Sequence, residues 1–597
     1  MLEQVNSQDQ SRTIEKTIVI WGAGRIGRGF IADLFHAAGY RLVLVDQSLQ
    51  LIAQLRQAGQ FTVVRTGSGG RRSDVVISGY IALSTDQANE IAAAIARADL
   101  LAVAVFPKMF ADVIRQLVPG LLLRQTERPD APLDILLCTN LLHPGPQFHA
   151  LLHDALPPEA LSYAESRIGV VETQVIRIAP DPPAELRQCD PLLVWTNGYP
   201  ELPVDRTGFR GEIPSVAGLR PVDDMRTQEM LKLYTYNTFH AALAYLGALG
   251  GHELISECMA DPQVRAAAVG ALEEASRALA AEYGLASDEM AAWVASVITH
   301  TDNPALGDTV QRFGADPPRK LTRGDRLVGP ALLARKHDIP APYLVRTLAA
   351  ALQFGYADDP GVAHVQEQIA ASGLGQAVSE MCGLTDAEQD LVEAIVHDYH
   401  HLHLEAEWAE RARQAYELGF GYEKVYHGCG QCVLAAVLET LNRPDARASG
   451  AVSDAALGAV FNAATGLSGG QGLCGDATCS AFTGSVLAFG LLYPRRREHF
   501  DGDRENKYRT FAMVQRLRER FLRTYGSITC QAIHQHEMGR AFDLRDAAER
   551  EAFEAAGAHQ AKCTNLVARA AQWAIEIIAE QQVEDVLSDQ DTGGQGR

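Results

Sequence analysis

The stretch that most constrains the fold lies near the N-terminus, where a strand-like run is followed by a glycine-rich turn and a helical pattern. Residues 17–21 read TIVIW, the turn reads GAGRIG, and the next residues, FIADLFHAAG, have the apolar spacing of a helix. A second strand-like run, RLVLVD, ends at Asp46. Strands joined through a helix lie parallel in one sheet. The sequence therefore predicts an α/β domain here.

The glycines of the turn have the G-x-G-x-x-G spacing of a dinucleotide site, which predicts a Rossmann-type domain over residues 17–205. Asp46 stands about 20 residues on, where an acid would bind the adenosine ribose and would repel the 2′-phosphate of NADP. NAD is therefore the expected cofactor, and the alternative is an αβ turn without nucleotide. The predicted cofactor-binding residues are Gly22, Gly24, Arg25, Ile26, Gly27, Asp46 and Phe106.

Two further runs, at residues 100–106 and 134–140, are almost continuously apolar, as is typical of buried parallel strands. Ligands bind at the carboxyl ends of such strands, so we expect Phe106, Pro107, Thr139 and Asn140 to border the cofactor crevice. Strand-like segments between residues 167 and 197 are expected to complete the sheet. From residue 206 to 390 the pattern is mainly helical and predicts an α-helical substrate domain.

Residues 231–240, LKLYTYNTFH, place Lys232, Asn237 and His240 in the spacing K-x4-N-x2-H. On a single helix all three would share one broad side. A buried lysine has a lowered pKa, so Lys232 could remove a hydroxyl proton while the two other side chains hold the oxygen. Glu229, one turn earlier, could relay that proton. The alternative is a solvated polar face, although the apolar residues that follow His240 argue against it.

The chain is acidic, with a formal net charge of −21, which argues against a nucleic-acid or anionic-membrane partner. We identify no signal peptide and no run of about 18 apolar residues, so the cytoplasm is the expected location. One basic loop, RKLTRGDR, is a candidate site for an anionic substrate group, and a solvated loop is the alternative. Its basic residues are Arg319, Lys320, Arg323 and Arg326.

A helical linker is expected at residues 391–410, and it contains four histidines. His397 and His401 lie one turn apart and could share a metal ion. We favour a connecting helix with exposed histidines, which also include His400 and His403.

Six of the ten cysteines fall in the last third, which predicts a separate all-α module over residues 411–581. Several stand where helices are expected to begin, so the helix dipole should lower the thiol pKa. In a reducing compartment such cysteines indicate redox chemistry or metal binding rather than structural disulfides. The redox or metal candidates are Cys429, Cys432, Cys474, Cys479, Cys530 and Cys563. Residues 1–16 and 582–597 are expected to be disordered.

The segments GAGRIGRGFIADL, KLYTYNTFHAALAYLG and RKLTRGDRL resemble the long-chain polyol (mannitol) dehydrogenase family over residues 17–390. The resemblance is strongest to members that act on a sugar phosphate. It implies NAD-dependent interconversion of D-mannitol 1-phosphate and D-fructose 6-phosphate, without a metal ion. It also implies that Lys232 is the general base, and that Asn237, His240 and Asn140 position the oxygen. Thr139 and Ile176 depart from the family pattern, which usually has Glu and Asp there.

The last third resembles a family named for its cysteine pattern, C_GCAxxG_C_C, over residues 410–580. Cys429, Cys479, Cys530 and Cys563 match the four pattern positions, whereas Cys432 and Cys474 are additional. The resemblance implies redox or metal chemistry, and Zn²⁺ or an iron–sulfur cluster stays open as a ligand of these thiols.

Two alternatives for the whole chain follow from these observations. Within the polyol family, the substrate could be a hexuronate or a free polyol, since Thr139 and Ile176 depart from the pattern. In another class, the chain could be an NAD(H)-binding redox sensor whose cysteines respond to the redox state. The fusion itself suggests that the cysteine module regulates the dehydrogenase. The sequence does not indicate an oligomeric state.

Overall fold

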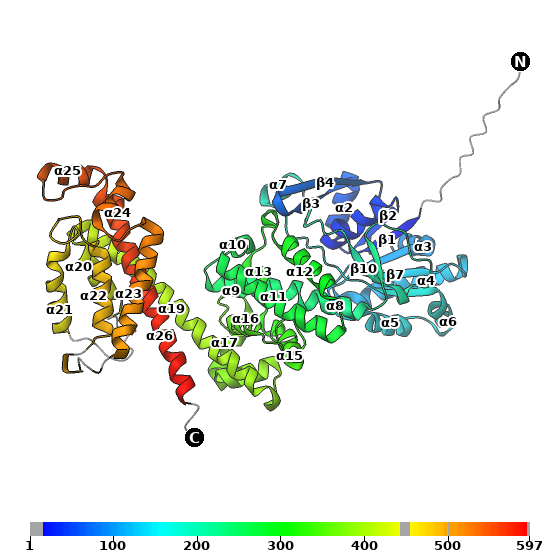
Figure 1. Ribbon diagram of the computed structural model, residues 1–597. Coiled ribbons are helices and arrows are strands. Elements are labelled where there is room, and N and C mark those ends of the chain that lie inside the picture. Colours follow the sequence, from blue (N-terminus) through cyan, green and yellow to red (C-terminus); the bar gives the residue numbers. More distant parts are fainter. Residues whose placement is uncertain (1–15, 442–453, 496, 500–501, 503, 594–597) are drawn as a thin grey trace, which may run out of the picture. The chain divides into compact units, whose positions relative to one another are not determined.

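The computed structural model describes residues 16–441, 454–495, 497–499, 502 and 504–593 (Figure 1). The chain divides into two compact units, residues 1–399 and residues 400–597. The predicted disorder of residues 1–16 falls outside the described residues, except for residue 16. Among the described residues, no helix combines the length and apolar character needed to cross a bilayer.

A six-stranded parallel sheet forms the centre of the first unit, in the order β5-β2-β1-β6-β7-β8. The chain leaves β1 toward β2 and β5 and then crosses to β6 on the other side, so the order reverses beside β1. The crevice at such a point is where nucleotides bind in open α/β sheets. The strands are β1 (Thr17–Trp21), β2 (Arg41–Asp46), β5 (Ile81–Ser84), β6 (Leu100–Val103), β7 (Leu133–Leu137) and β8 (Ile168–Glu172). The predicted Rossmann-type fold is confirmed.

Both faces of this sheet are buried, which explains why its strands are almost wholly apolar. In β1, Ile18 and Ile20 pack into one hydrophobic core, while Val19 and Trp21 pack into the other. Successive side chains of a strand point to opposite faces, so one strand serves both cores. The surrounding helices are α1 (Asp33–Ala37), α2 (Leu49–Ala58), α3 (Ala88–Arg97), α4 (Phe110–Glu127), α5 (Pro144–Ala155) and α6 (Pro158–Arg167).

Two smaller sheets accompany the main one, and they correct one expectation. Only β8 of the segment between residues 167 and 197 joins the main sheet, because β9 (Val194–Thr196) pairs with β3 (Gln60–Gly67) instead. Gly29 makes this possible, since a Cβ there would lie 2.5 Å from the side chain of Val194. The remaining strands are β4 (Arg71–Ser78), antiparallel to β3, and the parallel pair β10 (Leu202–Asp205) and β11 (Leu219–Val222). A short helix, α7 (Ala184–Cys189), precedes β9.

The rest of the first unit is helical, as expected. Its central helix, α9, is buried on most sides and packs against α11, α13 and α16. The helices are α8 (Met225–Tyr234), α9 (Tyr236–Leu249), α10 (Ile255–Ala260), α11 (Pro262–Tyr283), α12 (Ser287–Thr301), α13 (Val310–Gly314), α14 (Pro317–Lys320), α15 (Val328–Lys336), α16 (Pro342–Leu352), α17 (Pro360–Ser372) and α18 (Leu374–Cys382).

The second unit is all-α in its described residues, as predicted. Helices α20, α22, α23 and α26 pack around one core. A Cβ at Gly484 would lie 2.4 Å from the carbonyl oxygen of Gly430, so α20 and α22 approach closely only because position 484 is glycine. The helices are α19 (Gln389–Tyr426), α20 (Cys429–Leu441), α21 (Asp454–Ala463), α22 (Ser480–Leu492), α23 (Arg504–Tyr525), α24 (Cys530–Met538), α25 (Ala547–Ala555) and α26 (Cys563–Gly593).

Helix α26 extends to Gly593, so it includes the first part of the segment from residue 582 that is predicted to be disordered. The segment VEDVLSDQ contains no glycine or proline, so nothing in it interrupts a helix that begins 20 residues earlier. Residues 594–597 lie outside the described residues.

A buried ion-pair network joins the helix after the glycine turn to the three-stranded sheet β4-β3-β9. The carboxylate of Asp33 is fully buried and accepts hydrogen bonds from Arg177 and Arg65. Arg177 is 5% exposed and also donates to the carbonyl oxygens of Gly29 and Tyr199. Removing one partner of such a pair leaves the other charge buried and unpaired.

We predict that Asp33→Ala lowers the stability of the first unit by about 3–5 kcal/mol. The matched control is Asp74→Ala, which breaks an exposed arginine–aspartate pair with Arg72 and should cost at most about 1 kcal/mol. Thermal unfolding of the full chain measures both. Equal shifts of the transition midpoint in the two variants would show that the Asp33 network does not stabilise the fold.

Candidate functional site

The glycine turn after β1 has the geometry of a nucleotide-binding turn. Gly22 has a φ of +96°, and a Cβ there would lie 2.5 Å from the carbonyl oxygen of Ala104. A Cβ at Gly27 would lie 1.9 Å from the carbonyl oxygen of Gly22, so the helix packs closely on the strand. A Cβ at Gly24, by contrast, would meet open space, with nothing within 4 Å beyond its chain neighbours. The turn therefore leaves room for a phosphate group to approach the backbone.

The other predicted cofactor-binding residues lie on or near the same edge of the sheet. Asp46 ends β2, the strand hydrogen-bonded to β1, and its Oδ1 accepts from the backbone N–H of Ser48. Phe106 follows β6, the other neighbour of β1, and is 75% exposed. Arg25 forms a surface ion pair with Asp181 at 3.2 Å, and Ile26 packs partly against the core. The turn, the acid and the exposed ring fit the demands of a dinucleotide.

The prediction of one continuous helix through Lys232, Asn237 and His240 is wrong, because α8 ends at Tyr234 and α9 begins at Tyr236. Thr235, between them, has φ −120° and ψ −75°. Its hydroxyl donates to the carbonyl oxygen of Leu231 and accepts from the indole N–H of Trp293 at 2.9 Å. A threonine side chain that bonds to the preceding turn competes with the helix backbone, which accounts for the break.

Lys232 lies in the last turn of α8, and its Nζ donates to Oδ1 of Asn140 at 2.9 Å. Asn140 comes from the segment after β7, so the pair joins the Rossmann-type sheet to the helical domain. Burial lowers the pKa of Lys232 to about 8, and nearby Arg326 acts in the same direction while Glu229 opposes it. A lysine with this pKa is neutral often enough near pH 8 to accept a proton.

Glu229 lies one turn before Lys232 and is 6% exposed. Its two carboxylate oxygens accept from the backbone N–H of His143 at 3.1 and 3.2 Å. Burial raises the pKa of Glu229 to about 7, and the Glu172 carboxylate adds to that rise. Glu229 and Lys232 can therefore both change protonation state near neutral pH.

A cleft of about 380 Å³ brings together many of the predicted site residues. Its lining includes Asn140, Glu229, Lys232, Asn237, Arg319 and Arg326. His240 does not line this cleft. Its Nε2 lies 3.1 Å from the hydroxyl of Thr301, its ring stacks on Phe313, and burial lowers its pKa to about 3. In this arrangement His240 is a neutral, half-buried residue that does not line the cleft.

The basic loop divides into two pairs. Arg319 and Arg326 line the cleft, although each also contacts an aspartate, Asp316 at 3.0 Å and Asp325 at 2.7 Å respectively. Lys320 is buried and donates to the backbone carbonyl oxygens of residues 313 and 315, and burial lowers its pKa to about 7. Arg323 instead pairs with Glu388 at 2.7 Å. The expectation that all four form an anion site is therefore wrong for Lys320 and Arg323.

Sequence reasoning missed Gln174 as a site residue. It is 5% exposed, lines the cleft, and its Oε1 has no hydrogen-bond partner within the described residues. It stands two residues after β8, so the rule that ligands bind at the carboxyl ends of parallel strands could have found it. An unpartnered buried amide at a cleft wall is available to bind a substrate hydroxyl.

The second unit contains a cavity of about 220 Å³ that is lined by four cysteines. They are Cys429, Cys479, Cys530 and Cys563, the four that match the family pattern. As predicted, Cys429, Cys530 and Cys563 begin helices, and Cys479 directly precedes α22. Cys432 and Cys474 do not line the cavity. All ten cysteines are free thiols.

The expectation that helix dipoles lower the thiol pKa values is wrong for the cavity cysteines. Burial raises the pKa of Cys479 to about 11 and that of Cys530 to about 12. It raises the pKa values of Cys429 and Cys563 well above the usual range, and the neighbouring carboxylate of Glu423 adds to both. Desolvation of a thiolate outweighs a half-charge at a helix end.

The open glycine turn, the acid on β2 and a proton acceptor in a cleft beside the sheet define an NAD-binding oxidoreductase. Residues 16–218 match the family profile of the mannitol dehydrogenase Rossmann domain, and residues 224–417 match the mannitol dehydrogenase C-terminal domain. This part of the chain belongs to the mannitol dehydrogenase family. Residues 427–577 match a third family, "Putative redox-active protein (C_GCAxxG_C_C)". The predicted fusion of the two families is confirmed.

Solved structures agree on the fold of the first unit. A D-sorbitol dehydrogenase in substrate-free form is 15% identical, with a TM-score of 0.57, over 66% of this chain and 94% of that one. Mannitol 2-dehydrogenase from Pseudomonas fluorescens, in a ternary complex with NAD and D-mannitol, is 17% identical, with a TM-score of 0.51, over 65% of this chain and 92% of that one.

We predict that the cavity thiols react slowly in the native protein, because a buried thiol that is not ionised is a poor nucleophile. A thiol-specific alkylating reagent should label the exposed Cys189 and Cys474 first. Peptide mass mapping at successive times measures the order, and labelling in denaturant provides the control in which every thiol reacts. Early labelling of Cys429 or Cys563 would contradict the buried arrangement.

Proposed function

We propose that the first unit is a mannitol-1-phosphate 5-dehydrogenase, which interconverts D-mannitol 1-phosphate and D-fructose 6-phosphate with NAD in the cytoplasm. The observation that carries the proposal is the contact between Lys232 and Asn140 at 2.9 Å in a cleft that also contains two arginines. The lysine supports the alcohol chemistry, and the arginines support an anionic substrate.

The residues of this chain account for the proton in that reaction. Neutral Lys232 accepts the proton of the substrate C5 hydroxyl, and Asn140 and Asn237 hold the oxygen through their side-chain amides. The glycine turn at Gly24 and the carboxylate of Asp46 would hold NAD, which would supply the acceptor for the hydride that leaves the same carbon. Glu229, with its pKa raised to about 7, takes the proton onward from Lys232 toward solvent. In the reverse direction, protonated Lys232 donates to the carbonyl oxygen.

Arg319 and Arg326 support the assignment of a phosphate ester. A phosphate would compete with the aspartates that these arginines now contact, and it carries more charge than a carboxylate. Of the two departures from the family pattern, Thr139 lines the cleft. Ile176 is 4% exposed and does not line it. Thr139 is therefore the departure that bears on substrate choice.

A second candidate function uses the same chemistry on a hexuronate or a free polyol. The pairing of both cleft arginines with aspartates favours it, since these arginines already have partners without any substrate anion. An NAD(H)-binding redox sensor is the candidate from another class, in which the first unit has no turnover.

NADH consumption by the full chain with fructose 6-phosphate, fructose, fructuronate and tagaturonate separates these functions. We expect a strong preference for fructose 6-phosphate, and we expect Arg319→Gln to raise its KM about tenfold through loss of a charge-assisted hydrogen bond. The control is Arg335→Gln, which removes an exposed arginine paired with Asp390. Preference for another sugar would establish the second candidate, and inactivity with all four would favour the sensor.

We predict that Lys232→Ala lowers kcat by about 10²–10⁴-fold, the usual contribution of a general base, while NADH still binds. In the wild type, kcat/KM for alcohol oxidation should rise with pH and level off above about 8, because Lys232 must lose its proton first. Ketone reduction should show the opposite trend.

The control for this variant is Lys336→Ala, which removes an exposed lysine paired with Glu282. NADH binding is followed by nicotinamide fluorescence in each variant. If Lys232→Ala kept its turnover, or if the wild-type profile were flat between pH 6 and about 9 despite a pKa near 8, another group would be the base.

For the second unit we propose thiol-based redox chemistry, supported by four cysteines that line one cavity. Binding of Zn²⁺ or an iron–sulfur cluster by these cysteines is the alternative. We also propose that the redox state of this module regulates the dehydrogenase. Equal dehydrogenase activity of the reduced and oxidised chain would exclude that regulation.

A further inference from the structure

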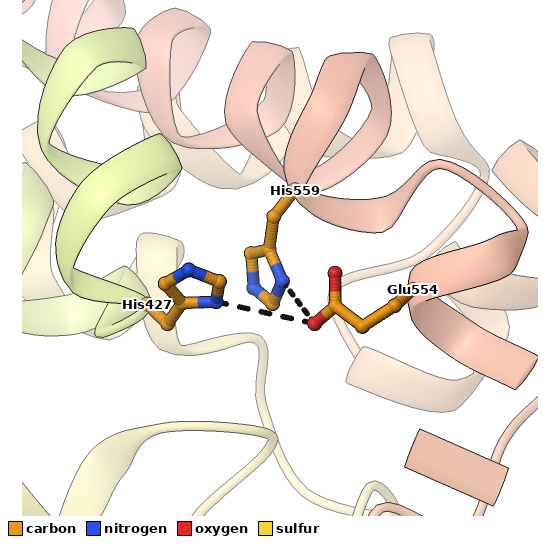
Figure 2. A group of neighbouring side chains, drawn as sticks. All are labelled: His427, Glu554 and His559. Carbon is orange, nitrogen blue, oxygen red and sulfur yellow. Dashed lines mark hydrogen bonds and ion pairs between the residues drawn. The ribbon is translucent and has the colours of Figure 1, made fainter. Parts of the chain in front are cut away.

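Two histidines and a glutamate come together in the second unit, and they line the same cavity as the four cysteines (Figure 2). His427 lies between α19 and α20, Glu554 lies on α25, and His559 lies in a short π-helical turn, η10 (Ala558–Lys562), before α26. Their ligand atoms all lie within 4.8 Å of one another, and no other set of three His, Cys, Asp or Glu side chains in the described residues meets that limit.

The distances within this group are close to those of a metal site. Nδ1 of His559 lies 2.6 Å from Oε1 of Glu554, and Nδ1 of His427 lies 3.9 Å from the same oxygen. The two imidazole centroids are 3.9 Å apart. A tetrahedral ion with bonds of about 2.0–2.2 Å holds its donor atoms roughly 3.3 Å apart, so small side-chain movements would complete the site.

The other nitrogen of His559 faces a second carboxylate. Its Nε2 lies 3.6 Å from Oε1 of Glu423, a residue of α19 that is fully buried. Metal-binding histidines commonly donate their second N–H to a carboxylate, which fixes the ring and raises its basicity. Glu423 therefore occupies the place of that supporting carboxylate.

Glu423 also has one oxygen that no protein group within the described residues satisfies. Its Oε1 accepts from the thiol of Cys429 at 3.1 Å, and its Oε2 has no hydrogen-bond partner within the described residues. Arg550 lines the same cavity, but its guanidinium donates to the backbone carbonyl oxygens of residues 544 and 545. A divalent cation bound by the group would lie near both carboxylates, Glu423 and Glu554, and would offset their negative charge.

We propose that His427, Glu554 and His559 bind one divalent transition-metal ion of the Zn²⁺ class, with Glu423 as the supporting carboxylate of His559. The set of two nitrogens and one oxygen leaves a fourth position for water or for a ligand that enters the cavity. The cysteines are not ligands in this site, so the proposal does not depend on redox chemistry in the module or on the function proposed for the first unit.

The test uses the full chain, loaded with Zn²⁺ or Co²⁺ and dialysed. We expect one tightly bound ion that is lost in His427→Gln, Glu554→Gln and His559→Gln. We expect Glu423→Gln to keep the site but to weaken it about 10–100-fold, the usual effect of losing a supporting carboxylate. The Co²⁺ form should show visible d–d bands without a thiolate-to-cobalt charge-transfer band.

The matched control is His536→Gln, which removes an exposed histidine that contacts Glu537 at 3.1 Å outside the group. This variant should bind as much metal as the wild type, and circular dichroism establishes that each variant is folded. Unchanged metal content in folded His559→Gln would overturn the proposal. A thiolate charge-transfer band that disappears in Cys429→Ser would overturn it as well, since the ion would then be held by cysteines.

Discussion

The buried carboxylate of Asp33 is the interaction on which the first unit most depends. It lies in the helix that follows the glycine turn, and it pairs with Arg65 on β3 and with Arg177 beyond β8. Arg177 in turn binds backbone carbonyl oxygens at Gly29 and Tyr199. One negative charge therefore connects three parts of the first unit: the helix after the nucleotide turn, the β4-β3-β9 sheet and the chain after β8. Its desolvation is tolerable only because two guanidinium groups surround it.

The same physical effect, burial of charge, prepares the cleft for proton transfer. Burial disfavours the ammonium of Lys232 and the carboxylate of Glu229, so their pKa values move toward each other, to about 8 and about 7. Arg326 contributes to the lowered pKa of Lys232 from one side, while Glu229 opposes it from the other. The cleft thus contains a lysine and a glutamate that both titrate near neutral pH, although neither residue type does so in water.

Local sequence patterns predicted the features that depend on local physics. The glycine turn, Asp46 and the strand ends follow from the rules of parallel sheets, and the structure places them together. The break at Thr235 was not predictable, because the hydroxyl that bonds to Leu231 also accepts from Trp293, which is 58 residues away. The direction of Lys320 was not predictable either, although its amino group donates to backbone carbonyl oxygens only five and seven residues earlier in the chain. The direction of such a side chain is decided by how the backbone around it folds, which the sequence pattern does not contain.

In the second unit, the cysteines stand at helix starts but are also buried, and burial decides their chemistry. Gly484, five residues after Cys479, lets α22 approach α20, the helix that begins at Cys429. This close approach brings thiols from separate helices to one cavity but also removes them from water. The expected activation by helix dipoles is therefore overridden, and the thiols stay protonated unless a positive charge enters the cavity. A cation held by His427, Glu554 and His559 would provide such a charge beside the thiols without being bound to them.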